Sequence, residues 1–223
     1  MSMSDSPSNS SDTLFPLIIA DYFPLFTDSS LGDSWESASE FSLRNFDGTF
    51  LPLEFQTTVK ARWNERSLNF RFQARYVELT QTPPHTVPNS MGKTMKLWDI
   101  ADVCEIFIGP EARQTRHYFE FQLAPDHHWL DLAINWEGDS IQTDFNWTAG
   151  ASFHSYIDSL NMIWYAFITL PIEAFPVSWK AGDEWDINCF RISQNPSFFM
   201  SWSPVYRIFF HQPERFGKIR FAK

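Results

Sequence analysis

Cysteine motifs for metal binding are missing from this chain of 223 residues, which contains only two cysteines, Cys104 and Cys189. Neither belongs to a Cys-x-x-Cys pair, and the sequence has no His-x-His pair, so the usual spacing of zinc ligands is absent. Both cysteines lie in apolar segments that resemble β-strands. We therefore expect two buried free thiols, and a single disulfide between them is the alternative.

Positive charge is also scarce. The chain has 17 Lys and Arg residues against 27 Asp and Glu residues, which gives a formal net charge of -10 at pH 7. Proteins that bind nucleic acid, or the surface of an anionic membrane, need a basic patch to neutralise phosphate groups. The sequence therefore predicts neither partner, and it leaves neutral polysaccharides, cations and small molecules.

Long apolar runs are absent, and so is the pattern of a targeting segment. No stretch is long and apolar enough for a transmembrane helix. The first residues, 1–12, are rich in Ser and lack the basic and apolar regions of a signal peptide. The sequence as written predicts a cytoplasmic protein, whereas a start site placed downstream of a true leader would make it a secreted one. We expect a disordered tail over residues 1–13 and a single domain over residues 14–223.

Catalytic motifs are missing as well. The chain has no Gly-x-Ser-x-Gly elbow, no His-Glu-x-x-His helix and no phosphate-binding loop. A glycoside hydrolase needs two carboxyl groups that face each other across a cleft. Glu105 and Glu120 are candidates for such a pair, but nothing in the sequence places them together. We predict a protein that is not an enzyme.

Aromatic residues are what the chain has in excess: 10 Trp, 6 Tyr and 23 Phe make up 17% of it. Such residues favour β-strands and fill a pleated core. The clearest strand is Leu68–Tyr76, where apolar and polar residues alternate. The other candidates are short and bounded by turn residues: Glu54–Trp63, Val103–Ile108, His117–Ala124, Leu130–Trp136, Ile163–Leu170, Trp185–Ser193 and Lys218–Phe221. Many short strands with no sustained helical period predict an all-β fold, a two-sheet antiparallel β-sandwich of the jelly-roll kind, with a long loop over Thr80–Thr94.

Three segments together resemble the family 9 carbohydrate-binding modules. They are Leu97–Ile108, with a Trp-containing loop before an Asp-x-x-Glu-Ile-Phe strand; Gly182–Arg191; and Ser201–Pro204 with the closing turn His211–Gly217. Asp28–Trp35 adds weaker support as an acidic turn before a Trp. The resemblance implies a β-sandwich and non-catalytic binding of an oligo- or polysaccharide. It also implies an accessory role to glycoside hydrolases in polysaccharide breakdown.

The same resemblance suggests which residues bind the sugar. Trp98 matches the first of two aromatic plates that hold a sugar ring, Glu105 matches the carboxylate that recognises hydroxyl groups, and the second plate falls at Phe210, next to His211. Asn188 and Arg191 stand on the strand near the C-terminus. Each has a structural alternative: Trp98 as a cap of the core, Asn188 as a hydrogen-bonding brace, and Arg191 as an ion-pair partner of Glu105.

Three questions stay open at the level of sequence. Calcium is known in the family, and acidic residues are available for it, although without EF-hand spacing: Asp99, Asp102, Asp126, Asp131 and Asp139. A related sandwich superfamily, the DOMON-like domains, binds haem, for which Met91, Met95 and Met162 are the candidate ligands. Finally, Phe210 and Phe190 stand where the family has Trp and Gln, which favours a structural or partner-binding sandwich with a decayed sugar site.

Overall fold

A computed structural model describes residues 15–24 and 35–223 of the chain. The expected tail over residues 1–13, and all but the last residue of the acidic turn Asp28–Trp35, lie outside the described residues.

The described chain is almost entirely β-structure. Its strands are β1 (Leu17–Tyr22), β2 (Glu40–Ser42), β3 (Arg44–Asn45), β4 (Thr57–Trp63), β5 (Ser67–Arg75), β6 (Val103–Gly109), β7 (Tyr118–Leu123), β8 (Trp129–Glu137), β9 (Ser140–Asp144), β10 (Ser152–Asp158), β11 (Ile163–Pro171), β12 (Glu184–Gln194), β13 (Ser197–Ser201) and β14 (Gly217–Ala222). The helical elements are single turns: α1 (Leu97–Ile100), α2 (Ala112–Thr115), η2 (Leu53–Phe55), η3 (Ile172–Ala174) and η4 (Pro213–Arg215).

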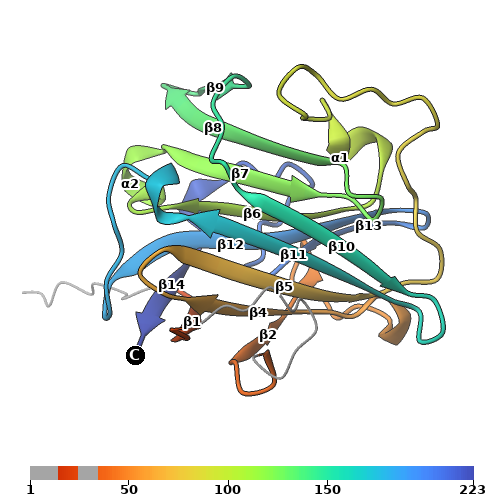
Figure 1. Cartoon of the computed structure of the whole chain (residues 1–223), viewed down its shortest axis with the longest axis horizontal. Helices are drawn as coiled ribbons and strands as arrows, with labels where there is room; N and C mark the ends of the chain where they lie inside the picture. The colour runs from red at the N-terminus through yellow and green to blue at the C-terminus, as the bar shows by residue number, and fades with distance from the viewer. Residues whose placement is uncertain (1–14, 25–34) are drawn as a thin grey trace, which may run out of the picture.

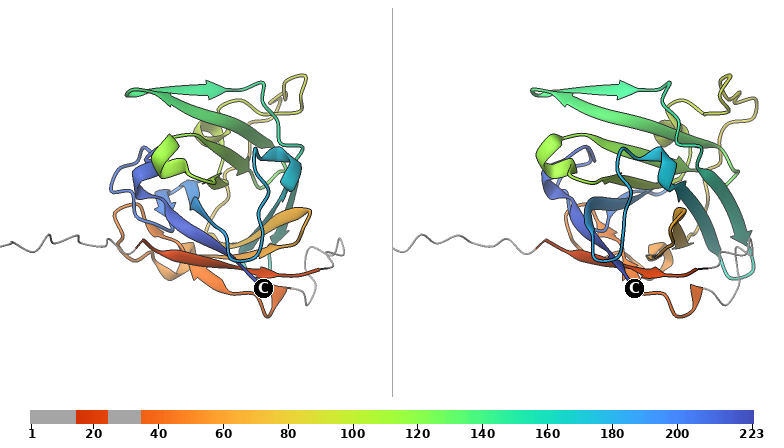
Figure 2. Two further views of the ribbon diagram at one scale, coloured as in Figure 1. Left: turned by 90° about the vertical axis from the view of Figure 1, so that its left-hand side faces the viewer. Right: turned by 60° about the vertical axis from the view of Figure 1, so that its left-hand side comes forward.

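The strands form one sheet that curls over on itself to give two facing layers (Figures 1 and 2). Its order is β10-β11-β5-β4-β1-β14-β12-β6-β7-β8-β9, and β2, β3 and β13 attach to its side. The expected all-β sandwich is confirmed, with one difference: β1 lies parallel to both β14 and β4, so the sheet is mixed. An alternating sequence shows which face of a strand is buried, but not the direction of the neighbouring strand, because either direction satisfies the same alternation.

The space between the layers is filled by the inward residues of each strand. On β5 these are the apolar positions of the alternation, among them Phe70 and Phe72, and Ile106 and Phe121 belong to the same core cluster. The two cysteines are buried here as free thiols. The predicted strand Leu68–Tyr76 thus corresponds to β5, and each of the other seven candidates overlaps an observed strand.

Three central strands, β6, β7 and β12, are buried on both of their faces. Their outer face carries a second apolar cluster that includes Phe107, Tyr118 and Phe190. It is covered by α1 and by the loop before β14, which contribute Leu97 and Phe210. Polar side chains on this outer face are therefore withdrawn from solvent.

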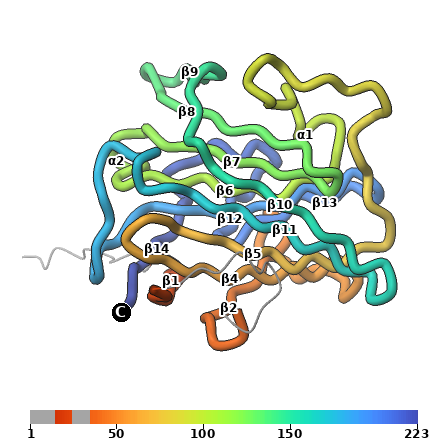
Figure 3. The backbone as a smooth tube through the Cα atoms, in the orientation of Figure 1, coloured from red at the N-terminus to blue at the C-terminus, as the bar shows by residue number. Residues whose placement is uncertain are grey.

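The predicted loop over Thr80–Thr94 contains no strand or helix and runs from the end of β5 to α1, as the yellow part of the tube shows (Figure 3). It therefore leads the chain to the outer face of β6, β7 and β12, where α1 begins.

Candidate functional site

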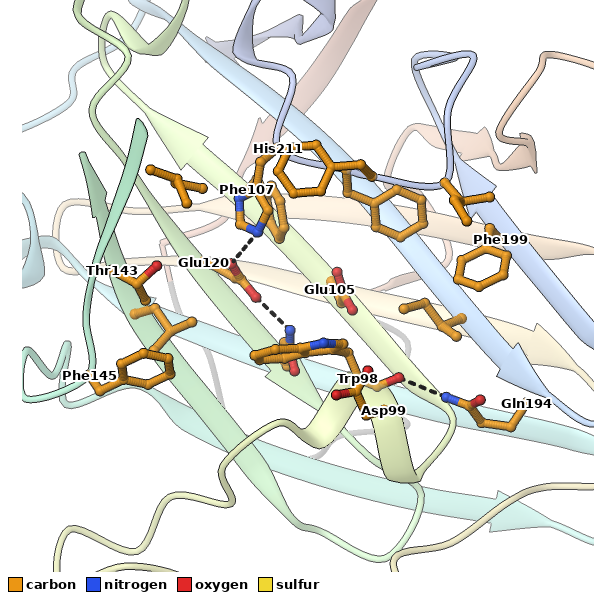
Figure 4. Close-up of a pocket in the computed structure, with 17 residues that line it drawn as sticks. Trp98, Asp99, Glu105, Phe107, Glu120, Thr143, Phe145, Gln194, Phe199 and His211 are labelled. Carbon is orange, nitrogen blue, oxygen red and sulfur yellow. Dashed lines mark hydrogen bonds and ion pairs between the residues drawn. The ribbon is translucent and has the colours of Figure 1, made fainter. Parts of the chain in front are cut away.

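A pocket of about 470 Å³ opens on the outer face of β6, β7 and β12 (Figure 4). Besides these strands, α1, β8, β9, β13 and the loop before η4 line it. The side chains that line it are Trp98, Asp99, Glu105, Phe107, Glu120, Gln122, Leu132, Ile141, Thr143, Phe145, Ile192, Gln194, Phe199, Ile208, Phe209, Phe210 and His211.

The floor of the pocket carries a polar group made of Glu105 on β6 and Glu120 and Gln122 on β7. The strand register places Glu105 directly opposite Gln122, and Glu120 opposite Phe107. All three polar side chains are at most 2% exposed. Residues two apart on one strand share a face, so the antiparallel pairing of β6 with β7 brings both carboxyl groups into one pocket.

Several acceptor atoms of this floor lack a donor. Gln122 donates its amide N–H to Oε1 of Glu120. Within the described residues, no hydrogen bond reaches Oε1 of Glu105, Oε2 of Glu120 or Oε1 of Gln122. Buried polar atoms without partners are costly, so these three oxygens favour a ligand that brings hydroxyl or amide donors.

Burial also changes the ionisation of the pocket. It raises the pKa of Glu120 to about 8, and it raises the pKa of Glu105, to which the neighbouring Glu120 adds a smaller repulsive contribution. Burial lowers the pKa of His211 to about 4. The Nε2 atom of His211 lies 3.7 Å from Oε2 of Glu120, but at neutral pH both groups are uncharged, so this contact is no ion pair. The floor then offers neutral groups that both donate and accept hydrogen bonds.

Trp98 forms one side of the pocket. Its half-buried ring projects from α1 and lies on the opposite side of the two glutamates from His211 (Figure 4). Gln194 holds α1 in place, because its side-chain amide donates to the backbone oxygens of Trp98 at 2.7 Å and Ala101 at 3.0 Å. The plate expected at Trp98 therefore rests on a braced helical turn.

The aromatic side chains opposite belong to the loop Ile208–His211. Phe210 is only 6% exposed and stacks on Phe190 with ring centroids 4.2 Å apart. Its neighbour Phe209 is 50% exposed and also lines the pocket. Phe210 thus belongs largely to the second apolar cluster, and Phe209 presents the more accessible aromatic surface.

Of the six site residues suggested by the sequence, Trp98, Glu105, Phe210 and His211 line this pocket, and Asn188 and Arg191 do not. Asn188 is a brace: its amide group donates to the backbone oxygen of Ser203 at 2.8 Å and accepts from the backbone N–H of Ser203 at 2.9 Å. It fixes the start of the loop that carries Phe209, Phe210 and His211.

Arg191 lies inside the sandwich, where it donates to Thr57 Oγ1 at 2.9 Å and to the backbone oxygen of Arg75 at 2.7 Å. The suggested ion pair between Arg191 and Glu105 is wrong. Arg191 pairs across the sheet with Cys104, the neighbour of Glu105, so the two side chains point to opposite faces.

The sequence indicates Glu120 only as a candidate catalytic partner of Glu105, and it does not indicate Gln122, Gln194 or Phe209 as site residues. A signal for Glu120 and Gln122 was present, because they are alternate residues in an otherwise apolar strand segment, Tyr118–Leu123. Nothing comparable marks Gln194 or Phe209, whose roles depend on where α1 and the loop pack.

Metal and haem ligands do not gather in the part of the chain that the structure describes. No three His, Cys, Asp or Glu side chains of residues 15–24 and 35–223 come together as a metal-binding group. Met91, Met95 and Met162 are each at least 36% exposed, and none of them lines the pocket. No helix among the described residues is long and apolar enough to cross a membrane.

Comparison with known proteins gives a distant sequence relative and solved structures with a similar fold. No family model matches the sequence. A protein of Arthroderma benhamiae described as an extracellular protein is 23% identical over 187 residues, which covers 75% of this chain and 79% of that protein. A crystal structure from Bacteroides uniformis, of a protein proposed to bind carbohydrate, superposes with a TM-score of 0.71 at 17% identity over 93% of this chain and all of that one.

Two further structures are of a family 9 carbohydrate-binding module from Caldicellulosiruptor kristjanssonii, in complex with glucose and with cellotriose. Their TM-scores are 0.61 and 0.60 at 10% identity, over 93% of this chain and 97% and 94% of those chains. At these identities the agreement concerns the fold. The resemblance seen in the sequence is thereby confirmed, and this chain has the fold of the family 9 carbohydrate-binding modules.

Proposed function

We propose that this protein binds a saccharide, without catalysis, in the pocket between Trp98 and Phe209. The observation that carries the proposal is the set of three buried oxygens of Glu105, Glu120 and Gln122 that lack a donor within the described residues, on a floor flanked by aromatic rings. The fold shared with modules solved in complex with glucose and cellotriose supports the same ligand class.

A sugar ring suits both the polar floor and the aromatic sides of this pocket. Its hydroxyl groups both donate to and accept from the unpartnered oxygens, and its apolar C–H face covers an aromatic ring and removes water from it. A pocket of about 470 Å³ has the size of a small-ligand site and accommodates a sugar ring. Neutral groups on the floor favour a neutral hydroxyl-rich ligand, since no full charge has to be matched.

The arrangement of the carboxyl groups supports binding in preference to hydrolysis. A glycoside hydrolase needs an acid and an ionised carboxylate on either side of the scissile bond. Glu105 and Glu120 instead lie side by side on the floor, on neighbouring strands, and the pKa of each is raised by burial. We expect no release of reducing sugar from oligosaccharides that bind, and a reducing-end assay checks this.

A role beside glycoside hydrolases in polysaccharide breakdown is the biological setting that we propose.

Calorimetric titration tests the proposal with glucose, cellotriose and xylotriose, each with calcium and with a chelator. We expect saturable binding by the wild-type protein, and a loss of about tenfold or more in Trp98→Ala, because one buried aromatic face contributes about 1.5 kcal/mol or more. Glu105→Gln keeps the volume but changes the donors and acceptors, and should also weaken binding. Dependence on calcium would reveal a resident ion.

Tyr156→Ala is the matched control, because Tyr156 is 43% exposed on β10 and does not line the pocket. It should bind as the wild type does. Equal affinity of Trp98→Ala and wild type would move the site elsewhere. No binding of any saccharide by the folded protein would contradict the proposal and favour a partner-binding sandwich with a decayed site.

A further inference from the structure

A second hollow of about 490 Å³ adjoins the saccharide pocket. Phe209 and His211 line both, so the two share a wall. The second hollow lies between the end of β8, the loop Val205–Phe209 and η4, and its lining includes Arg116, Trp136, Tyr206, Arg207, Glu214 and Arg215. Because the wall is shared, a ligand longer than one sugar ring has room to extend from the first pocket past Phe209 into the second hollow.

The charge of the second hollow is opposite to that of the protein. Three arginines and a single acidic residue line it, whereas the whole chain has a net charge of -10. Concentrating arginine at one place on an acidic protein creates a local positive potential that attracts an anionic group. The floor of the first pocket has no such excess.

Two of these arginines have free capacity for an anion. Arg207 is exposed and forms no salt bridge with any described residue. Arg215 lies over the ring of Tyr206, 5.3 Å from its centroid, and likewise has no carboxylate partner in the described chain. A guanidinium group offers a planar pair of N–H donors that matches a carboxylate in a bidentate manner.

The third arginine is fixed in position. Arg116 lies 3.9 Å from the centroid of Trp136 and donates to the backbone oxygen of Gly138 at 3.0 Å. Its 3.9 Å contact with the fully exposed Asp139 is weak. Arg116 and Trp136 therefore form a preorganised side of the hollow.

The loop that carries Tyr206 and Arg207 is held in a backbone conformation that few side chains adopt. Tyr206 has φ of 61°, in the left-handed region. The backbone N–H groups of Val205 and Tyr206 both donate to the backbone oxygen of Phe46, at 3.0 and 2.8 Å, which holds this conformation in place. Backbone strain that the surroundings maintain is commonly found at ligand sites.

We propose that the second hollow binds the carboxylate of a uronic acid unit, joined to the sugar in the first pocket, so that the protein prefers acidic saccharides. This inference rests on the proposed function. Arg207 and Arg215 bind the carboxylate, and the rings of Tyr206 and Phe209 contact the sugar. Sulfate esters share the anionic chemistry, but the planar carboxylate is the better match to a pair of guanidinium groups at the rim.

The experiment compares three ligands that differ at one position: cellotriose, cellotriose with its terminal ring oxidised at C6 to the carboxylate, and cellotriose 6-sulfate. We expect the carboxylate form to bind at least about tenfold more tightly than cellotriose, as charge-assisted hydrogen bonds allow. The double variant Arg207→Gln/Arg215→Gln should lose this preference and keep its affinity for cellotriose. Raising the salt concentration should weaken only the binding of the charged ligands.

The control Arg44→Gln/Arg66→Gln makes the same change in net charge at two exposed arginines outside both hollows. It should retain the preference for the carboxylate. Equal binding of all three ligands by the wild type would overturn the inference and leave the proposed function standing, and tighter binding of the sulfate than of the carboxylate would overturn the uronic acid assignment. Failure of all three ligands to bind would instead contradict the proposed function itself.

Discussion

At the scale of single residues, Glu105, Glu120 and His211 show how burial decides chemistry. Each would be charged, or close to its titration midpoint, on a neutral aqueous surface. In the pocket, loss of solvent raises the pKa of both glutamates and lowers that of the histidine. A raised pKa favours the protonated carboxyl group, which forms hydrogen bonds with hydroxyls and leaves the recognition of charge to the arginines of the second hollow.

The titration of Glu120 should be visible in the stability of the protein. Its folded-state pKa of about 8 exceeds its ordinary value of 4.5, so its contribution to stability is complete below about pH 4.5 and is lost as the pH rises through about 8. The contribution of His211 has the opposite sign and changes only as the pH falls from 6.5 to about 4. Between pH 6.5 and 8 the Tm of the wild type should therefore fall more steeply than that of Glu120→Gln.

Thermal unfolding followed by circular dichroism at several pH values in that range measures the difference. Glu137→Gln, an exposed substitution on β8, should retain the wild-type slope. If Glu120→Gln retained it too, Glu120 would be ionised in the folded protein, and the neutral floor would be wrong.

At the scale of elements, the loop between β13 and β14 decides the shape of both hollows. Three side chains hold this loop in place. Asn188 forms two hydrogen bonds with the backbone of Ser203, and the hydroxyl of Ser203 donates to the backbone oxygen of Arg215 at 2.7 Å. Gln212 donates to the backbone oxygen of Phe209 at 2.7 Å. Gly217 leaves room for the ring of Trp202, because a Cβ atom at position 217 would lie 2.3 Å from that ring. The Ser-Trp-Ser and Phe-Gly segments of the sequence are thus parts of one scaffold for the site.

Asn188→Ala should affect binding without touching the ligand. It removes both hydrogen bonds to Ser203 and the one that Asn188 accepts from the backbone N–H of Cys189. The backbone groups of Ser203 are then left unpaired in a buried place, which costs about 2–3 kcal/mol of unfolding free energy. Since the loop that carries Phe209 and His211 then loses its anchor, the affinity for cellotriose should fall as well. Urea unfolding and calorimetry measure the two effects, with the exposed Asn135→Ala as control. Loss of affinity without loss of stability would indicate that Asn188 contacts the ligand.

At the scale of the whole molecule, β1 joins the two layers of the sandwich. It pairs in parallel with β14 over Leu17–Asp21 and with β4 at Asp21 and Tyr22. No other strand lies between β4 and β14 in the sheet order of the described residues. We propose that residues 15–223 fold as one cooperative domain, because neither layer retains its edge pairing without β1.

Ile18→Ala tests this cooperativity, because Ile18 is 1% exposed and pairs with Ile219 of β14 near the start of β1. A truncation of this kind typically costs about 2–5 kcal/mol. Native-state hydrogen exchange should show that amide protection falls together in β5 and β6, which lie in different layers, whereas Val87→Ala in an exposed loop should change neither. Protection lost in one layer only would show that the layers unfold separately.

The sequence by itself determined the class of fold and most of the long strands. Alternation of apolar and polar residues, as in Leu68–Tyr76, depends only on local geometry, so it predicted the strands that build the core. Several strands were not predicted: β1, β2, β3, β9, β10 and β13. The alternation of β9 and β10 buries few residues, and the three residues of β2 and two of β3 are too few to show a period.

Only the tertiary structure decided which residues share the site. Trp98 and Glu105 are near each other in the sequence, and the resemblance singled them out together with Phe210 and His211. Glu120 shares the pocket with Glu105 because of the register of β6 with β7, and Arg191 is kept out of the pocket by the register of β12 with β6. A shift of one residue in either register would reverse which side chains face the pocket, and single-strand patterns do not encode that pairing.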